Sequence, residues 1–472
     1  MRKGGPDGTG RQLNESVLTP AGLKSGKFGQ LWSKSLDGSI WGQPLYMNGI
    51  TIGSTVRNVV YVTTNNDSVY AFDGDTGAQV WKKSFLSTGV TAVPAADLQI
   101  SSQTGILSTP VIDPVRQVIY VVAATKEPNA TIQYPHRLHE LSLTTGAEIL
   151  ATQPITHANL PSMMKFQRPG LLLANGMVYV AFGSVEDRTP YHGLLFAFDA
   201  ITLAQEAVFD VAPTLSSGGI WMSGAAPAAD ENGNIYISTG NMGYSTTRGL
   251  NDFGESIVKL SPMLQELDHF TPFDYETLDK SDYDLGSGGV LLVPGLNGGM
   301  YEVIACGKPK PIYVLNRDSL GGVGATKDNI VQSIPNQLGS SLPCFNTPAM
   351  WQQNVYFAAN HDVLKMFVLD PSLGKFPGNP PTPVSKGTFT YNYPGADPVV
   401  SSNGNSNGIV WTIGFDASKV PTLRANDATD VSKELWVSPS LTSAVRWVPP
   451  TVVNGHVYVG ASSRLVAFGM TP

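Results

Sequence analysis

Two carboxylates, Asp252 and Glu255, close a long polar segment that opens with the amide residue Asn241. A carboxylate beside a divalent cation can act as a general base, and side-chain oxygens are the ligands that hard cations prefer. Both residue types are also common in solvated loops, where asparagine tolerates left-handed turns. The segment is longer than the roughly two to five residues of a hairpin loop, and long loops more often carry function.

Arg168, which follows Gln167, is a second candidate for binding chemistry. The planar guanidinium fork pairs with carboxylates, including those of a quinone or an acidic sugar. The alternative is a structural ion pair with Glu186 or Asp187. His192 could act as a base or a ligand, although a lone histidine more often does neither.

These residues must be positioned by a repeated strand pattern, which is clearest between Val59 and Phe85. Apolar and polar residues alternate in three runs, separated by turns rich in Asn, Asp and Gly. This pattern is typical of short antiparallel strands joined by tight turns. The same unit recurs along the chain, and eight copies begin at about Gln43, Ser108, Gln167, Gly218, Gly286, Phe345, Gly395 and Trp447.

The last copy ends one strand short, while the lone run Phe28–Asp37 has no unit of its own in front. A ring of four-stranded sheets removes its free edges when the N-terminal strand completes the last sheet. The sequence therefore predicts an all-β, eight-bladed β-propeller over residues 28–472, after an irregular lead-in over residues 1–27. A smaller propeller with a separate domain is the alternative, but the spacing of roughly 50–60 residues per unit disfavours it.

In such a ring, the loops that enter the innermost strands and the loops between the second and third strands share one face around a central funnel. Both kinds of loop carry our candidates. The first kind carries Gln167, Arg168, Trp221, Asn346 and Asp397, and the second carries Glu186, Asn241, Asp252, Glu255 and Lys308. Of these, we expect Gln167, Arg168, Asn346 and Asp397 to contact a ligand in the funnel.

The bulk properties exclude some classes of partner. The net charge of −7 argues against a nucleic-acid surface, and no apolar stretch approaches the roughly 20 residues of a membrane span. The N-terminus lacks the apolar core of a signal peptide, whereas sequons at Asn14, Asn66 and Asn129 weakly favour secretion. Cys306 and Cys344 fall near the same rim and form either a disulfide or two buried thiols.

The run AFDGDTGAQVW, residues 71–81, resembles the A-x-D-x-x-T-G-x-x-x-W repeat of pyrroloquinoline-quinone propellers. The resemblance implies that blade tryptophans such as Trp81 pack between neighbouring blades. Non-catalytic scaffold propellers carry the same repeat, so it indicates architecture more than chemistry.

Residues 218–241, GGIWMSGAAPAADENGNIYISTGN, resemble a stretch of quinoprotein alcohol dehydrogenases. The resemblance implies that Trp221 stacks on the flat face of the quinone and that Asn241 helps to hold a calcium ion. An aromatic platform and an oxygen ligand suit a planar cofactor and a hard cation. The alternative for Trp221 is a tryptophan that only packs between blades.

The same resemblance extends to four further residues. It implies that Asp252, or its rival Glu255, is the base that takes the alcohol proton, and that Lys308 contacts the quinone. Glu186 lies in the loop of the family's metal-ligand glutamate, at a different spacing. The chain departs from the family in lacking an adjacent cysteine pair. It also has no Cys-x-x-Cys-His segment, so we expect no haem and an external electron acceptor.

Three functions follow as expectations. The first is a secreted, extracellular or periplasmic dehydrogenase that oxidises an alcohol or a sugar in the funnel with pyrroloquinoline quinone and Ca²⁺. The second is a non-catalytic propeller that binds a carbohydrate or a protein. The third is a polysaccharide lyase or hydrolase on the same ring, using Arg168, His192 or a carboxylate pair.

Overall fold

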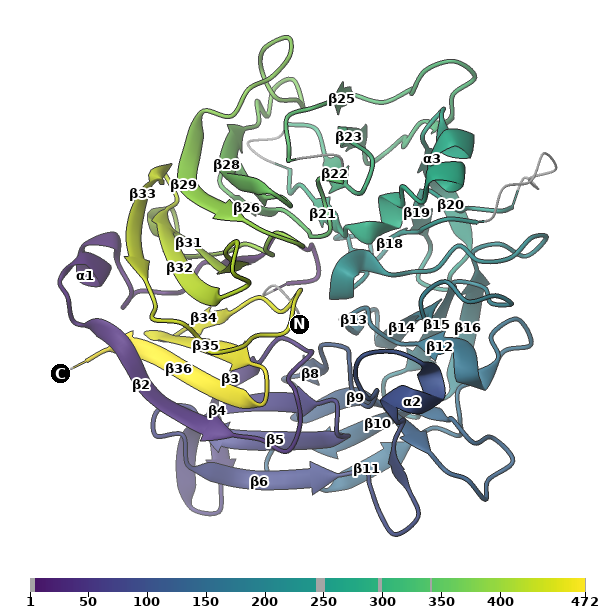
Figure 1. Cartoon of the computed structure of the whole chain (residues 1–472), viewed down its shortest axis with the longest axis vertical. Helices are drawn as coiled ribbons and strands as arrows, with labels where there is room; N and C mark the ends of the chain where they lie inside the picture. Colours follow the sequence, from purple (N-terminus) through teal and green to yellow (C-terminus); the bar gives the residue numbers. More distant parts are fainter. Residues whose placement is uncertain (1–4, 243–250, 296–298, 340–341, 472) are drawn as a thin grey trace.

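The computed structural model describes residues 5–242, 251–295, 299–339 and 342–471. Runs of alternating apolar and polar residues form its strands. The described residues form eight sheets arranged in a ring (Figure 1). Blades one and two contain β3 (Leu45–Ile52), β4 (Thr55–Thr64), β5 (Ser68–Asp73), β6 (Gln79–Ser84), β7 (Thr91–Ala92), β8 (Val111–Asp113), β9 (Val118–Lys126), β10 (His136–Ser142) and β11 (Glu148–Ala151). Blades three and four contain β12 (Lys165–Phe166), β13 (Leu172–Ala174), β14 (Met177–Ser184), β15 (Leu194–Asp199), β16 (Gln205–Asp210), β17 (Ala228–Ala229), β18 (Ile235–Ser238), β19 (Ile257–Leu260), β20 (Glu266–Thr271) and β24 (Gly322–Val323).

The second half of the ring follows the same plan. Blades five and six contain β21 (Val290–Leu292), β22 (Glu302–Cys306), β23 (Ile312–Asn316), β25 (Gln332–Ile334), β26 (Ala349–Trp351), β27 (Asn354–Ala358), β28 (Asp362–Val368) and β29 (Ser385–Tyr391). Blades seven and eight contain β1 (Arg11–Gln12), β30 (Val399–Asn403), β31 (Ser406–Phe415), β32 (Pro421–Asp427), β33 (Asp430–Val437), β34 (Thr451–Val453), β35 (His456–Ala461), β36 (Arg464–Met470) and β2 (Phe28–Ser35). This arrangement confirms the predicted eight-bladed β-propeller.

The N-terminal strand closes the ring, as the sequence predicts. Strand β2 pairs antiparallel with β36 and becomes the outermost strand of blade eight, with Phe28 opposite Met470 and Ser35 opposite Arg464. The purple and yellow ends of the chain therefore lie in one sheet (Figure 1). The pairing gives blade eight its fourth strand, as the ring requires, and leaves β2 as the outer edge of that sheet.

Blade tryptophans bridge to the next blade, and the glycine of the Thr-Gly turn makes room for them. The indole N–H of Trp81 donates to the Leu143 carbonyl at 2.9 Å, and its ring lies against Gly146. A Cβ on Gly146 would come within 2.5 Å of that ring, and its φ of 69° already favours glycine. Trp32 packs in the same way against Gly77, so the Thr-Gly-x-x-x-Trp spacing joins neighbouring blades.

The lead-in before β2 runs along the inside of the ring. Backbone N–H groups of the innermost strands of blades four to seven donate to carbonyls of residues 6–10 at 2.7 to 2.9 Å; the donors are Ala229, Leu292, Met350 and Val400. Strand β1 then pairs parallel with β30. The buried Glu15 accepts from the backbone N–H of Gly455 at 2.9 Å, which ties the lead-in to blade eight. These contacts tie the lead-in to the innermost strands of blades four to seven and to blade eight.

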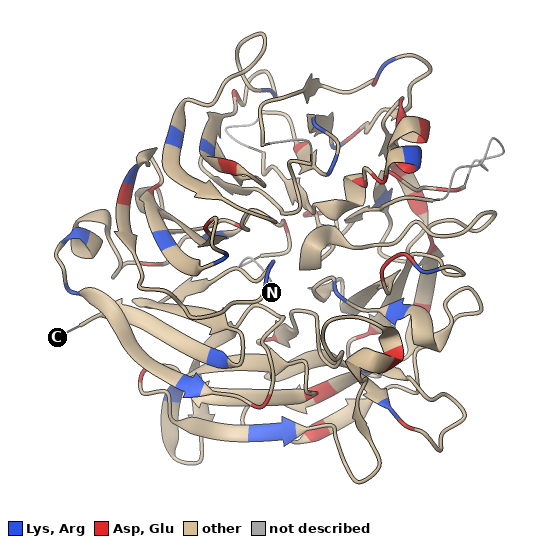
Figure 2. Cartoon of the chain, viewed as in Figure 1, with Lys and Arg blue, Asp and Glu red and all other residues tan. Residues whose placement is uncertain are grey.

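Among the described residues, helix is confined to the short segments α1 (Pro20–Lys24), α2 (Ala95–Leu98) and α3 (Tyr275–Ser281) and to single 3₁₀ turns at Ser162–Met164, Met222–Gly224 and Leu285–Ser287. In the part of the chain that the structure describes, no helix has the length and apolar composition to cross a membrane. Charged residues of both signs are spread over the ring, and several acidic residues lie in and beside α3 (Figure 2). That acidic group borders the candidate site.

Candidate functional site

A cavity of about 480 Å³ lies where the loops that enter the innermost strands converge. Its wall combines aromatic, acidic and basic side chains. They include Trp41, Phe166, Arg168, Glu186, Asp187, Trp221, Asp284, Lys308, Phe345, Arg446 and Trp447. Four of the residues that the sequence singles out therefore border one cavity, namely Arg168, Glu186, Trp221 and Lys308.

Trp221 is held in a bed of glycines. Cβ atoms on Gly183, Gly219 and Gly240 would approach its ring to 3.0, 2.6 and 3.2 Å, so only glycine leaves room for the indole at these positions. Phe166 supports it from blade three at 6.2 Å between ring centroids. Trp221 thus packs between blades three and four and also borders the cavity. The two readings of this tryptophan, as platform and as packing residue, are therefore compatible.

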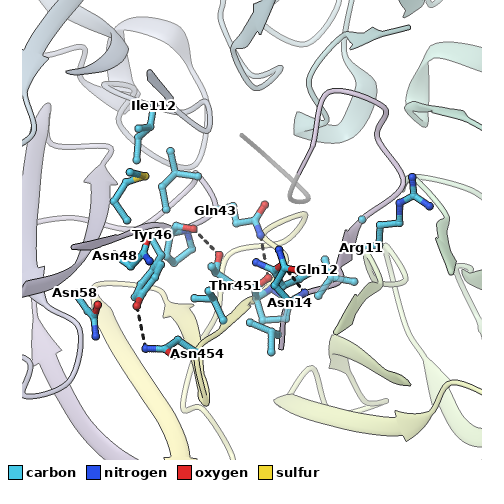
Figure 3. Close-up of a pocket in the computed structure, with 18 of the residues that line it drawn as sticks. Arg11, Gln12, Asn14, Gln43, Tyr46, Asn48, Asn58, Ile112, Thr451 and Asn454 are labelled. Atoms are coloured by element: carbon cyan, nitrogen blue, oxygen red, sulfur yellow. Dashed lines mark hydrogen bonds between the residues drawn. The ribbon is translucent and has the colours of Figure 1, made fainter. Parts of the chain in front are cut away.

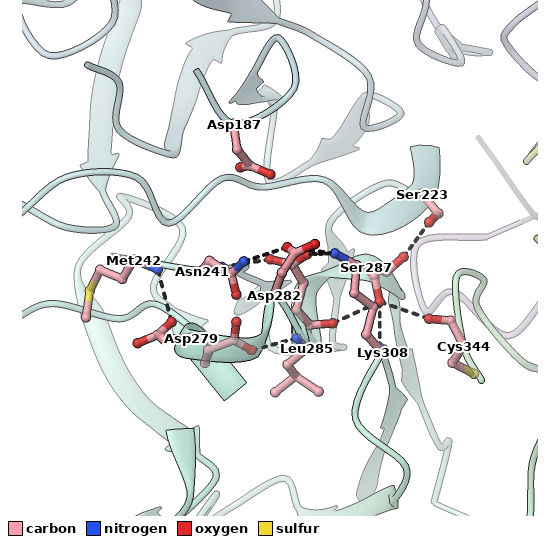
Figure 4. A network of polar contacts seen from close by, with 12 residues as sticks. Asp187, Ser223, Asn241, Met242, Asp279, Asp282, Leu285, Ser287, Lys308 and Cys344 are labelled. Atoms are coloured by element: carbon pink, nitrogen blue, oxygen red, sulfur yellow. Dashed lines mark hydrogen bonds and ion pairs between the residues drawn. The ribbon is translucent and has the colours of Figure 1, made fainter. Parts of the chain in front are cut away.

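Lys308 is one of three cationic residues on the described cavity wall, with Arg168 and Arg446. Its ammonium lies 2.5 Å from Asp284 Oδ2 and 2.9 Å from Asp282 Oδ1 (Figure 4). Burial disfavours the charged form, but the two carboxylates outweigh it and raise the pKa of Lys308. Helix α3 ends at Ser281, and Asp282 takes a left-handed backbone that turns the chain towards Lys308. The lysine is therefore protonated at neutral pH.

Asn241 and Glu255 lie behind this ion pair. Asn241 donates its backbone N–H to Asp284 at 2.9 Å and its side-chain N–H to Asp282 at 2.8 Å. Glu255 is fully buried and accepts from the backbone N–H of Leu285 at 2.7 Å. Burial, followed by the nearby Asp284 charge, raises the pKa of Glu255 well above its usual range. Glu255 does not border the cavity.

Two buried oxygens of this cluster have no hydrogen-bond donor among the described residues. They are Oδ1 of Asn241 and Oε1 of Glu255. An unsatisfied buried acceptor costs about 1–3 kcal/mol, so such atoms mark either strain or the place of a bound group. Within the described ranges, however, no three His, Cys, Asp or Glu side chains are grouped closely enough for a metal centre of that kind. Residues 243–250 of the expected long loop lie outside the described residues.

Asp187 and Glu186 are adjacent and both exposed, but their side chains have different partners. Asp187 accepts from the Tyr191 hydroxyl at 2.5 Å and lies across from the Asp282 group (Figure 4). The side chain opens on the cavity, yet desolvation and the neighbouring Asp284 and Asp282 charges raise the pKa of Asp187. The Glu186 side chain is 66% exposed and lies 3.5 Å from Arg188. Of the two, Asp187 is the carboxylate directed at the lysine-aspartate cluster.

Arg168 forms the basic side of the cavity. It is buried, donates to the Leu107 carbonyl at 3.1 Å and lies 5.6 Å from the centre of the Trp41 ring. A contact with the Arg446 carbonyl at 3.4 Å holds the other end of the guanidinium. The backbone contacts fix the orientation of the fork, which is the condition for specific recognition of an anion.

Several candidates instead hold loops together and do not border this cavity. The side chain of Gln167 donates to the Pro169 carbonyl at 2.7 Å, and that of Asn346 donates to the Ala358 carbonyl at 3.0 Å. Asp397 accepts from the backbone N–H of Thr347 at 2.9 Å, and Asp252 accepts from that of Thr214 at 3.0 Å. The imidazole Nδ1 of His192 lies 2.8 Å from Asp210 Oδ1.

The sequence left the state of the two cysteines open, and the structure pairs them. Cys306 and Cys344 form a disulfide with their Cα atoms 5.7 Å apart. The Cys344 carbonyl accepts a hydrogen bond from the Ser287 hydroxyl at 2.9 Å, and Ser287 borders the cavity. The disulfide therefore braces the loop that enters blade six beside the site.

Sequence reasoning missed Asp282 and Asp284 as members of the site, and it named Asp187 as a possible ion-pair partner of Arg168. A usable signal was present, because Asp282 and Asp284 come directly before the Gly-Ser-Gly-Gly run that enters blade five. The loop that enters blade five is one of the expected funnel loops. The pattern Asp282-Tyr283-Asp284 in it could have suggested two carboxylate partners for Lys308.

Solved structures with this fold include enzymes. A europium-containing methanol dehydrogenase matches with a TM-score of 0.68 at 13% identity, over 99% of this chain and 97% of that one. Quinohemoprotein alcohol dehydrogenases from Pseudomonas putida HK5 and Comamonas testosteroni match with TM-scores of 0.65 and 0.63 at 16% and 17% identity. These alignments cover 97% and 98% of this chain and 78% and 80% of theirs.

The chain has the propeller fold of quinoprotein alcohol dehydrogenases. No family model matches its sequence, and no curated protein resembles it in sequence. The similarity to these enzymes, at 13–17% sequence identity, shows that the chain shares their fold and no more. The chemistry of this quinoprotein-like propeller therefore has to be argued from the residues of the cavity.

Proposed function

We propose that the chain is a dehydrogenase that binds pyrroloquinoline quinone and a hard cation in the funnel cavity and oxidises an alcohol or a sugar there. The observation that carries this proposal is Trp221, an aromatic ring held by three glycines at the edge of a cavity that also contains Lys308 and Arg168. The enzymes of the same fold support it by analogy.

The residues present fit a planar anionic cofactor. Trp221 offers an aromatic surface, and stacking on such a surface contributes about 0.5–1.5 kcal/mol beyond area burial. Arg168 and Lys308 supply fixed positive charge beside it, which suits the carboxylates of the quinone. The adjacent cysteine pair of the family is absent. The disulfide of this chain joins Cys306 and Cys344, which are 38 residues apart, so it is not a disulfide between neighbouring residues.

The donor set also fits a hard cation, because it consists of oxygens. Asp284 would hold it from the cavity wall, and the orphaned oxygens Asn241 Oδ1 and Glu255 Oε1 would hold it from behind that wall. When bound, the quinone would take up the two electrons of the substrate and the cation would polarise it. Lys308 competes with the cation for Asp284, so cation binding requires the ammonium to move away from that carboxylate.

We assign the proton-accepting role to the two carboxylates near Lys308 that are not proposed cation ligands, Asp187 of the cavity wall and Asp282. Asp282 is 70% exposed, and Asp187 has a raised pKa that brings it closer to neutral pH, where a base works best. Glu255 is buried behind them, and Asp252 is bound to Thr214 outside the cavity wall. Both are less suited than the cavity carboxylates to contact a substrate.

Titration of the protein with quinone in the presence of Ca²⁺ or Eu³⁺ tests the proposal without an activity assay. We expect quenching of tryptophan fluorescence and Eu³⁺ luminescence that needs Asp284. Trp221→Leu should weaken quinone binding by about tenfold, while the matched variant Trp436→Leu, in a tryptophan that packs on Phe28 away from the funnel, should not. Absence of quenching at micromolar quinone would refute the assignment.

A second candidate is a non-catalytic ligand-binding propeller. The observation that favours it is the pairing of Lys308 with both Asp282 and Asp284, which offsets one of their two negative charges without a metal. In that case Eu³⁺ would fail to bind even when Lys308→Met removes the competing ammonium.

Export to an oxidising compartment, and transfer of electrons to an external acceptor, belong to the same proposal. The Cys306–Cys344 disulfide supports export, because disulfides persist mainly in secreted and periplasmic proteins. Fractionation of the producing cells is the direct measurement. Recovery of the protein with reduced cysteines in the cytosol would contradict it.

A further inference from the structure

A second cavity, of about 710 Å³, opens on the channel of the propeller on the side of the turns between first and second strands. Its walls come from β3 of blade one, β34 of blade eight, β30 of blade seven and residues 10–14 of the lead-in (Figure 3). In the described part of the chain, no residue borders both this cavity and the funnel cavity. The two cavities are therefore separate sites.

The position of the lead-in explains why this half of the channel stays open. Residues 6–10 cover the innermost strands of blades four to seven by backbone hydrogen bonds. The cavity lies beside the innermost strands of blades seven, eight, one and two. Its walls are strands braced by their sheets, which position side chains more rigidly than loops do.

Carboxamide side chains dominate the polar part of the wall, and they are Gln12, Asn14, Gln43, Asn48, Asn58 and Asn454. Among the described residues that border the cavity there is no carboxylate, and the single arginine, Arg11, lies 3.3 Å from Asp7. A carboxamide offers donors and an acceptor together, as a sugar hydroxyl does. The wall therefore matches a neutral ligand rich in hydroxyl groups.

Tyr46 supplies an aromatic surface beside these amides. Its ring is stacked on Tyr458 at 6.0 Å and 24° between planes, and its hydroxyl accepts from Asn454 Nδ2 at 3.2 Å. Asn48 is exposed, and its side chain forms no hydrogen bond within the described ranges. In Figure 3, Tyr46, Asn48, Asn58 and Asn454 come together on one side of the cavity.

We propose that this channel cavity binds a neutral saccharide of di- or trisaccharide size. Its volume lies within the roughly 300–1,000 Å³ of small-molecule sites. An aromatic face and paired amides recognise a sugar ring without charge, whereas a charged ligand would find no partner beyond the occupied Arg11. The proposal uses none of the funnel residues, so it stands or falls independently of the quinone proposal.

Saturation-transfer NMR and calorimetry with maltose, cellobiose, lactose and N,N′-diacetylchitobiose on the full chain test the inference. We expect at least one of them to bind. Tyr46→Ala should weaken that binding by roughly three- to tenfold, and Asn48→Ala, an exposed change that spares the fold, should weaken it too. Phe273→Ala, in an aromatic residue that is 43% exposed on another part of the surface, should leave binding unchanged.

Three results would overturn the proposal. One is no binding of any of the four probes at millimolar concentration. Another is binding that Trp221→Leu abolishes while Tyr46→Ala and Asn48→Ala do not, because the ligand would then lie in the funnel. The third is tighter binding of the neutral peptide Gly-Ser-Gly-Ser than of any probe, since the channel would then be a peptide site. A loss of binding in Tyr46→Ala with an unchanged melting temperature supports it.

Discussion

Glu255→Gln should stabilise the protein increasingly as the pH rises. Glu255 is fully buried, and one of its oxygens accepts from Leu285 N at 2.7 Å. The other has no donor among the described residues. Burial first, and the charge of Asp284 second, raise its pKa well above the ordinary value of 4.5. The native state therefore holds the Glu255 proton more tightly than the unfolded chain does.

The sign of the effect follows from that difference. Below about pH 4.5 both states are protonated at this residue, and the contribution of Glu255 is fully retained. Above it, the unfolded chain ionises first, so the free energy of unfolding falls by about 1.4 kcal/mol per pH unit until the native pKa is reached. Glutamine does not titrate, and it can keep the hydrogen bond from Leu285 while its N–H₂ faces the acidic neighbours.

The size of the shift is measurable. Between about pH 5 and about pH 7 the variant should gain at most about 3 kcal/mol over the wild type. With an unfolding entropy of about 2.1 cal/mol/K per residue, a chain of 472 residues shifts by about 1 °C per kcal/mol. Differential scanning calorimetry over this range should therefore show an advantage that grows to as much as about 3 °C.

The exposed Glu206 provides the control, because Glu206→Gln changes the same atoms where burial is absent. It should leave the melting temperature within about 0.5 °C across the range, as surface substitutions generally do. An advantage of Glu255→Gln that does not change with pH, or a loss of stability at about pH 7, would refute the burial argument.

Two further predictions concern the ring. The double variant Cys306→Ser, Cys344→Ser should lose about 3–4 kcal/mol of stability for a loop of 38 residues, measured as a lower melting temperature; equal melting of wild type and variant would contradict the disulfide. Trp81→Phe removes the hydrogen bond to the Leu143 carbonyl and part of the ring surface that packs on Gly146. The free energy of unfolding in urea should fall by about 1–3 kcal/mol. A change near zero would show that this contact does not join the blades.

The architecture was predictable because each blade is specified locally. Asp73 accepts from the backbone N–H and the hydroxyl of Thr76 at 2.9 and 2.8 Å, Gly77 turns with a φ of 69°, and Trp81 follows at a fixed spacing. A pattern that repeats with these contacts gives the same sheet each time. The closing strand Phe28–Ser35 could also be found, because the last blade lacks one strand and the chain offers one spare run.

The candidate site was only partly predictable. Trp221, Lys308 and Arg168 border the funnel cavity, and the family resemblance or the loop position pointed to each of them. Asp284 was not predicted because its partners come from other loops. The Asn241 backbone is 43 residues away along the chain, and Lys308 belongs to the next loop. Residue type and spacing do not show which of several acidic loop residues will meet.

By itself, the sequence determined the number of blades, the closure of the ring and the face on which the funnel loops lie, because turns and alternation act over a few residues. Only the tertiary structure decided that Lys308 pairs with Asp282 and Asp284, that the cysteines join, and that the lead-in is tied to the innermost strands of blades four to seven. These contacts join segments that are 24 to 38 residues or more apart in the chain, and their distances depend on how the blades pack. The open half of the channel is likewise a product of packing, since no single stretch of sequence encodes it.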